Sequence, residues 1–330
     1  MIKFLKRYYP ALIAIVLYFL ITTLRKHKIL NGYIVQVLMI AGINTIMTLS
    51  LNLINGFTGQ FCIGHAGFMS LGAYGSAVIT TLVFGGKAHT AAAMQPVVFV
   101  LSLIVGGLVA AIIGALIGLP SLKLKGDYLA IVTLAFGEIV RAILRLIKPI
   151  GAARGMIGIP NYTNIGWIIF FVALTMWLMR NLIYSPFGRA FIAIRDNEIA
   201  ADAMGIDTTK YKIMSFCIAA FIAGVAGGLY SHVLSFIQPD SFGFQKSSDF
   251  LVYLYAGGSG SMTGSLVGAV LLTVLPEVLR FLADWRLAIY AVVLVIVMLY
   301  RSEGLCGGWE LPFMRISRRS LYEGVKKEGE

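Results

Sequence analysis

Apolar runs of roughly membrane-crossing length follow one another along almost the whole chain, with short polar stretches between them. A transmembrane helix needs about 20 apolar residues, and most of these runs reach or approach that length. The pattern predicts an all-α, polytopic transmembrane bundle of nine or ten helices over residues 9–24, 33–54, 66–84, 95–119, 128–147, 165–183, 211–235, 244–256, 262–280 and 283–300. The run at 244–256 is short and precedes a glycine-rich stretch, which indicates a broken or tilted helix.

The distribution of basic residues gives a first orientation. With ten crossings and both ends in the cytoplasm, the larger share of the 27 lysine and arginine residues falls inside, as membrane topology favours. The basic residues after the first run oppose this arrangement: Arg25, Lys26 and Lys28. Nine helices with an outer N-terminus therefore stay open. We expect one transmembrane domain over 1–310 and a basic cytoplasmic tail over 311–330.

Composition excludes several protein classes. Hydrophobic residues make up 58% of the chain and charged residues 13%, against about 45–50% and about 25% in soluble domains. An ordinary soluble enzyme, a disordered chain and a disulfide scaffold are excluded. The net charge of +12 fits membrane orientation and anionic lipid better than nucleic acid, so no nucleic-acid partner is expected. The cysteines and histidines show no metal-ligand or catalytic spacing, so we predict no catalytic residues, metal or cofactor.

Two glycine-rich stretches interrupt the apolar pattern, one in each half of the chain. The first runs from Asn55 to Gln60 and on to Gly64, and the second from Gly257 to Gly264. Paired interruptions of this kind indicate a transporter's binding site and a weak internal repeat. The alternative is that glycine is simply common in membrane helices. Small residues spaced by four predict close helix packing: Gly106, Ala110, Gly114 and Gly118; Ala220, Gly224 and Gly228; Gly260, Gly264 and Gly268.

Hydrogen-bonding side chains gather in these stretches. Irregular backbone at membrane depth survives only against protein or a water-filled cavity. We therefore predict that these residues line a substrate pathway: Asn55, Thr58, Gln60, His65, Ser70, Tyr74, Ser259 and Ser261. Close helix packing with satisfied polar groups is the alternative, and for His65 alone it is the favoured one.

Two further features carry polar residues. The stretch 184–212 contains a short amphipathic helix at 196–205, which Asp196 or Asn197 caps and Gly205 ends. So short a helix buries little, which favours docking into a partner over the alternative of lying on lipid. Glu138 and Arg141 share one helix face. They serve either as a gate or as a structural ion pair near the outer boundary.

Several motifs together carry a family resemblance. Gly188-Arg189-Ala190, followed by Glu198-x-Ala200-Ala201-x-x-x-Gly205, resembles the EAA loop of ABC-importer permeases. With NGFTGQFCIGHAGFMSLGAYGSAV (55–78), KGDYLAIVTLAFGEIVR (125–141), GMIGIP (155–160) and YAGGSGSMTGSLVGAVLLTVLPEVLR (255–280), residues 33–310 resemble the branched-chain amino acid ABC permeases of the LivM type. Phe61-Cys62-Ile63 departs from the usual serine and leucine before Gly64-His65, which bears on local packing or substrate fit.

The resemblance implies a membrane subunit of an importer for branched-chain, hydrophobic amino acids in a bacterial-type cell membrane. It implies coupling to the ATPases through Gly188, Arg189, Glu198, Ala200, Ala201 and Gly205. The implied partners are a second, LivH-like permease, two ATPases and an extracytoplasmic binding protein. Topology and resemblance together place Arg154, Asn161, Asp240 and Lys246 on outer loops that meet this binding protein or are simply solvated.

The chain has no GxxxxGK[ST] phosphate loop, so ATP is expected on separate subunits. An importer for urea, short amides or another amino acid remains an alternative. An ion-coupled secondary transporter is a more distant one, since it would normally carry a midplane carboxylate and Glu138 is the only candidate.

Overall fold

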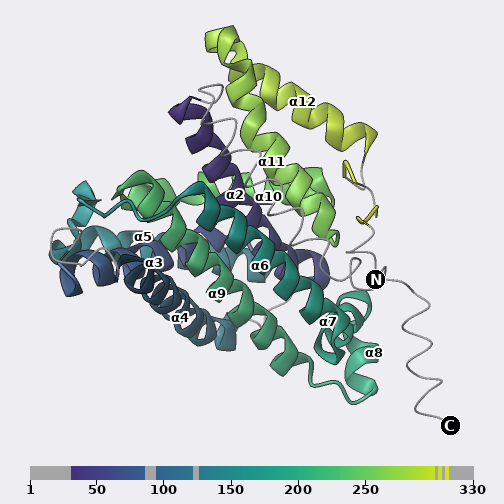
Figure 1. Cartoon of the computed structure of the whole chain (residues 1–330). Helices are drawn as coiled ribbons and strands as arrows, with labels where there is room; N and C mark the ends of the chain where they lie inside the picture. The colour runs from purple at the N-terminus through teal and green to yellow at the C-terminus, as the bar shows by residue number, and fades with distance from the viewer. Residues whose placement is uncertain (1–30, 86–93, 122–125, 302–303, 307–308, 312–330) are drawn as a thin grey trace, which may run out of the picture.

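A computed structural model describes residues 31–85, 94–121, 126–301, 304–306 and 309–311, which form the helical bundle of Figure 1. The predicted helix at 9–24 and residues 312–330 of the predicted tail lie outside the described residues. The main helices are α2 (Gly32–Asn52), α3 (His65–Val78), α4 (Gln95–Ser121), α5 (Asp127–Leu146), α6 (Ile165–Tyr184), α9 (Thr208–Leu234), α10 (Phe244–Gly257), α11 (Met262–Val278) and α12 (Arg286–Tyr300). The all-α prediction is confirmed.

Six helical segments within the described residues are long and apolar enough to cross a membrane: Gly32–Phe57, His65–Val83, Gln95–Pro120, Ile165–Tyr184, Thr208–Leu234 and Met262–Phe281. The first two include the short π-helices η1 (Leu53–Phe57) and η2 (Ile79–Val83). Helix α5 carries Glu138, Arg141 and Arg145, which set it apart from these apolar spans. Helices α10 and α12 have 14 and 15 residues. The total of nine or ten crossings stays a prediction.

Helices α3, α4 and α9 pack side by side through their small residues (Figure 1). A Cβ added to Gly72 of α3 would lie 2.1 Å from the Gly224 carbonyl oxygen of α9. A Cβ added to Gly106 of α4 would lie 2.6 Å from the Gly72 carbonyl oxygen. These separations are below any normal Cβ contact, so the backbones meet directly. The packing predicted from the four-residue spacing is confirmed here.

Helix α2 joins this group to α6 and to the pair α10 and α11. Asn44 of α2 donates to the Thr273 hydroxyl of α11 at 2.9 Å. A Cβ added to Gly268 of α11 would lie 2.3 Å from the Tyr253 carbonyl oxygen of α10. The second small-residue stripe therefore also serves close helix contact.

Short elements close the two ends of the bundle. At one end, β1 (Met156–Ile157) pairs antiparallel with β2 (Phe236–Ile237), beside η3 (Lys148–Ile150), η4 (Ala152–Arg154) and η5 (Pro239–Phe242). Segment η6 (Leu279–Trp285) joins α11 to α12. At the other end, α7 (Pro186–Asp196) and α8 (Glu198–Ala203) lie between α6 and α9 (Figure 1).

Helix α7 corrects the sequence interpretation, which placed a single short helix in 184–212. The chain signals this helix: Pro186 occupies its first turn, and the Ser185 hydroxyl accepts the Gly188 amide at 3.4 Å. Proline and a serine cap are typical of a helix start.

Candidate functional site at two helix breaks

Both glycine-rich stretches are breaks between helices. The helical turns of η1 end at Phe57, residues 58–64 run without helix, and α3 begins at His65. Helix α10 ends at Gly257 and α11 begins at Met262. At about 1.5 Å per residue, the 14 residues of α10 span about 21 Å, less than the roughly 30 Å of a bilayer core. The expectation of a broken helix there is confirmed.

Asn52 connects the two breaks, although the sequence interpretation did not single it out. Its side-chain amide donates to the Ser261 carbonyl at 2.9 Å and to the Ser265 hydroxyl at 2.8 Å. Its oxygen accepts the Gly260 amide at 2.9 Å. Asn52 is 0% exposed, so these three bonds satisfy a polar group that would otherwise be costly to bury. An asparagine inside an apolar helix run was the signal for it.

Arg195, the next-to-last residue of α7, extends this network toward the end of the bundle that carries α8. Its guanidinium donates to the Gly56 carbonyl at 3.3 Å and to the Asp196 carboxylate at 2.9 Å. Gly59 has a φ of +73°, and a Cβ there would lie 2.8 Å from the Arg195 Cγ. The arginine therefore contacts the first break directly and links it to the α7–α8 corner.

Three predicted pathway residues form hydrogen bonds with nearby groups, although the Nδ1 of His65 is buried without a partner. Thr58 donates to the Leu53 carbonyl at 2.7 Å, and Ser70 donates to the Gly67 carbonyl at 2.7 Å. The His65 Nε2 lies 2.6 Å from the Ser50 hydroxyl of α2. These contacts are those of the packing alternative, and a pathway role for them stays a prediction.

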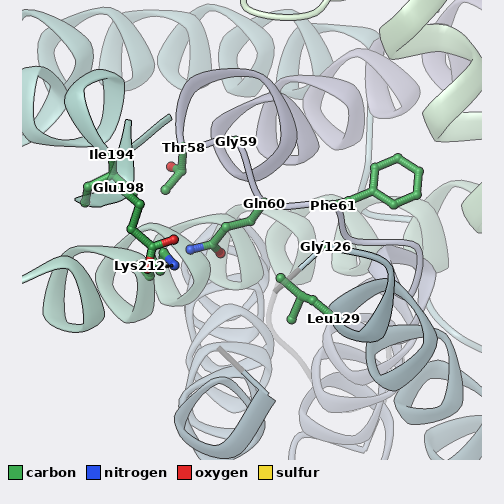
Figure 2. A pocket seen from close by; sticks show the side chains of 9 residues that line it. All are labelled: Thr58, Gly59, Gln60, Phe61, Gly126, Leu129, Ile194, Glu198 and Lys212. Carbon is green, nitrogen blue, oxygen red and sulfur yellow. Dashed lines mark ion pairs between the residues drawn. The ribbon is translucent and has the colours of Figure 1, made fainter. Parts of the chain in front are cut away.

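The other five take different positions. The Asn55 side chain accepts the Cys62 amide at 3.2 Å, and the Tyr74 hydroxyl reaches the Ile237 carbonyl at 3.5 Å. Ser261 caps α11 by accepting the Gly264 amide at 3.0 Å, whereas Ser259 is exposed. Gln60 lines a pocket together with Thr58 (Figure 2). The structure thus brings only part of the predicted set to one place.

Helix α8 begins after a capping asparagine and ends before a glycine. Asn197 is its N-cap and accepts the Ala200 amide at 3.0 Å, whereas Asp196 is the last residue of α7. Gly205 follows with a φ of +84°, a left-handed conformation that favours glycine. Of the two predicted caps, the structure selects Asn197, and the ending at Gly205 is confirmed.

The faces of α8 differ sharply. Ala201 is buried, whereas Ile199 and Met204 are 78% and 83% exposed. The Glu198 carboxylate points inward to the Lys212 ammonium of α9 at 2.8 Å. The remaining residues of the predicted coupling set divide the same way: Gly188 is buried, and Arg189, Ala200 and Gly205 are exposed. Coupling by these residues stays a prediction.

A segment after α12 covers the second break, which the sequence interpretation did not foresee. Leu305 donates its amide to the Ala256 carbonyl at 2.8 Å. The Glu310 carboxylate accepts the Met262 amide at 2.8 Å and the Thr263 hydroxyl at 2.9 Å. A carboxylate is well placed there, because the first amides of a helix lack partners within it.

Charged residues also join α5 to the segment before α10. Glu138 and Arg141 form the predicted ion pair, and Glu138 accepts the Phe244 amide at 3.2 Å. Arg145 pairs with Asp240, one of the predicted outer-loop residues. These partners favour the structural interpretation of the Glu138–Arg141 pair. Among the residues that the structure describes, no cluster of His, Cys, Asp or Glu could hold a metal ion.

Comparison with known proteins identifies the protein family. A family model described as the permease component of branched-chain amino acid transport systems matches residues 33–300. The chain belongs to this permease family. It is 33% identical to the high-affinity permease protein LivM of Salmonella typhimurium, over 79% of this chain and 67% of that protein. It is 32% identical to LivM of Escherichia coli, over 82% and 69%.

Two more distant relatives are a further LivM and a permease named for a different solute. The permease is 28% identical to a probable LivM of Methanocaldococcus jannaschii, over 82% of this chain and 92% of that protein. It is 28% identical to an autoinducer 2 import permease, LsrC, of Photorhabdus laumondii, over 44% of this chain. No solved structure matches the permease.

The permease is therefore a multi-pass membrane protein and a transport component, not an enzyme. Its family works with ATPase and binding-protein partners.

Proposed function

We propose that this permease forms the translocation pathway of an importer for branched-chain, hydrophobic amino acids and couples it to separate ATPase subunits through α8. The LivM relatives carry this substrate class in their names and align with most of the chain. The LsrC relatives carry a different solute and align with less than half of it. The substrate assignment therefore rests on the longer alignments.

The single observation that carries the coupling proposal is the contact of Arg195 with the first break. Helices α7 and α8 meet at Asn197, which caps α8 and directly follows α7. A displacement of α8 would move Arg195, and with it the Gly56 carbonyl that Arg195 binds. Asn52 would carry the movement on to Gly260 and α11. Short hydrogen-bonded links of this kind suit a bundle that alternates between two discrete packings.

The exposed face of α8 supports docking to a partner. Ile199 and Met204 are large apolar side chains that contribute little to the fold of this chain. Exposed apolar residues at the tip of a bundle are suited to bury against another protein. We assign this face to an ATPase, with a LivH-like permease completing the pathway and an extracytoplasmic protein delivering the substrate.

Uptake of radiolabelled L-leucine tests the transport function. Cells that express the full assembly are compared with cells lacking this chain, with isoleucine, valine and urea as competitors. We expect uptake that needs this chain and ATP and that isoleucine and valine block. Uptake that survives ATP depletion while an ion gradient remains would contradict the coupling proposal. ATP-dependent uptake of another solute, without uptake of leucine, would change only the substrate assignment.

Copurification of the ATPases tests the docking face. Met204→Asp places a charge on a side chain that is 83% exposed, so we expect lost ATPase association with an intact bundle. Ile157→Asp is the matched control, since Ile157 is 76% exposed in β1 at the other end of the bundle. Normal association and normal uptake in Met204→Asp would refute docking through α8.

A further inference from the structure

A pocket of about 110 Å³ lies where the first break meets α8 (Figure 2). Its walls come from the segment after η1, the start of α5, the end of α7, α8 and α9, and they include Gln60, Leu129, Ile194, Glu198 and Lys212. Sites for small molecules typically combine apolar walls with a few placed polar groups. This pocket has both features.

Gln60 is the first sign of a ligand. Its side chain is directed toward Glu198 and Lys212 in Figure 2. The residue is 5% exposed, yet neither its amide nitrogen nor its amide oxygen bonds to any protein group. A buried amide without partners is costly, because burial removes its hydrogen bonds to water. An amide aimed into a pocket under those conditions is suited to bind a polar ligand.

The ion pair beside Gln60 is the second sign. Lys212 is held on α9 with its side chain 9% exposed, and its ammonium lies 2.8 Å from the Glu198 carboxylate of α8. The pocket thus presents a cation, an anion and an amide that can both donate and accept. Leu129 and Ile194 provide apolar surface in the same pocket.

We propose that this pocket binds a zwitterionic aliphatic amino acid by its backbone groups. The ligand's carboxylate bonds to Lys212 and to the Gln60 amide nitrogen, and its ammonium group bonds to Glu198 and to the Gln60 amide oxygen. Its aliphatic side chain packs against Leu129 and Ile194. The proposal rests on the proposed function for its substrate class and adds a binding site formed partly by the coupling helix. A ligand between Glu198 and Lys212 would replace a contact that joins α8 to α9.

Equilibrium dialysis of radiolabelled L-leucine measures the binding. The preparation is the assembled membrane complex in lipid nanodiscs, without nucleotide and without the extracytoplasmic binding protein. We expect saturable binding that falls at least tenfold in Lys212→Met and about three- to tenfold in Gln60→Leu. Lys210→Met is the matched control with unchanged binding, since Lys210 lies exposed on the same helix outside the pocket.

The Gln60→Leu variant distinguishes a lost ligand contact from loss of folding. The Gln60 side-chain amide makes no hydrogen bond within the protein, so its replacement removes no such bond. Any lost leucine binding therefore reports a lost contact with the ligand. Isoamylamine, which lacks the carboxylate, and 4-methylpentanoate, which lacks the ammonium group, should each compete poorly with leucine. Either compound competing as well as leucine would overturn recognition of a zwitterion.

Two further outcomes would overturn the site while leaving the proposed function in place. One is leucine binding with the same affinity in Gln60→Leu and Lys212→Met as in the unchanged complex. The other is no saturable leucine binding in a preparation that transports leucine once the binding protein is added. Failure of leucine uptake itself would instead refute the proposed function.

Discussion

Replacing Asn52 by alanine should loosen the second break from α2 without unfolding the bundle. The change removes three hydrogen bonds at once, to the Ser261 carbonyl, the Ser265 hydroxyl and the Gly260 amide. Two of these partners keep another bond, because the Ser265 hydroxyl also donates to the Ser261 carbonyl at 3.1 Å. The Gly260 amide is the group that loses its acceptor.

The expected loss of local stability follows from these three hydrogen bonds. Leaving one buried amide unsatisfied costs about 1–3 kcal/mol, and each other lost bond contributes about 0.5–1.5 kcal/mol. Local stability of the break should therefore fall by roughly 2–6 kcal/mol. Since about 1.4 kcal/mol is a factor of ten, amide exchange at residues 260–265 should accelerate by roughly 30- to 20,000-fold.

Hydrogen–deuterium exchange with mass spectrometry, on the complex in nanodiscs, measures this effect. Asn44→Ala is the matched control, because Asn44 lies on the same helix and makes one hydrogen bond to α11, at Thr273. Its effect on residues 260–265 should be small. Unchanged exchange there in a folded Asn52→Ala protein, or equal acceleration by Asn44→Ala, would refute the role of Asn52 as the link between the breaks.

Further predictions concern glycines and the segment that covers the second break. Gly72→Ala should disrupt assembly of the bundle, since its Cβ would lie 2.1 Å from the Gly224 carbonyl oxygen. A Cβ at Gly205 meets nothing within 4 Å, so Gly205→Ala should cost only about 1–2 kcal/mol of backbone strain. Thermal unfolding of the two variants tests this contrast, and equal stability would contradict it. Burial and the Glu310 carboxylate raise the pKa of the Cys306 thiol. Glu310→Gln should lower that pKa and speed maleimide labelling at neutral pH, and an unchanged rate across a pH series would show that the Glu310 charge does not act on this thiol.

Much of the fold is determined by local sequence. The apolar runs predict the helices, and four-residue spacing of small side chains predicts that Gly106 meets a neighbouring helix, which the structure shows to be α3. The two helix breaks and a cap at Asp196 or Asn197 are also legible, because glycine and capping side chains act on their own stretch of backbone. Helix α7 carried a comparable signal at Ser185 and Pro186.

The composition of the site depends on contacts between segments far apart in the chain. Asn52 and Gly260 are 208 residues apart, and Arg195 and Gly56 are 139 apart. No local pattern shows which polar side chain finds a partner across such distances. Tertiary packing satisfies Thr58 and Ser70 within their own segments, turns Glu198 inward to Lys212, and leaves the Gln60 amide facing a pocket. The sequence by itself therefore determined the helices and their breaks, whereas only the tertiary structure decided which polar groups are satisfied and which face a pocket.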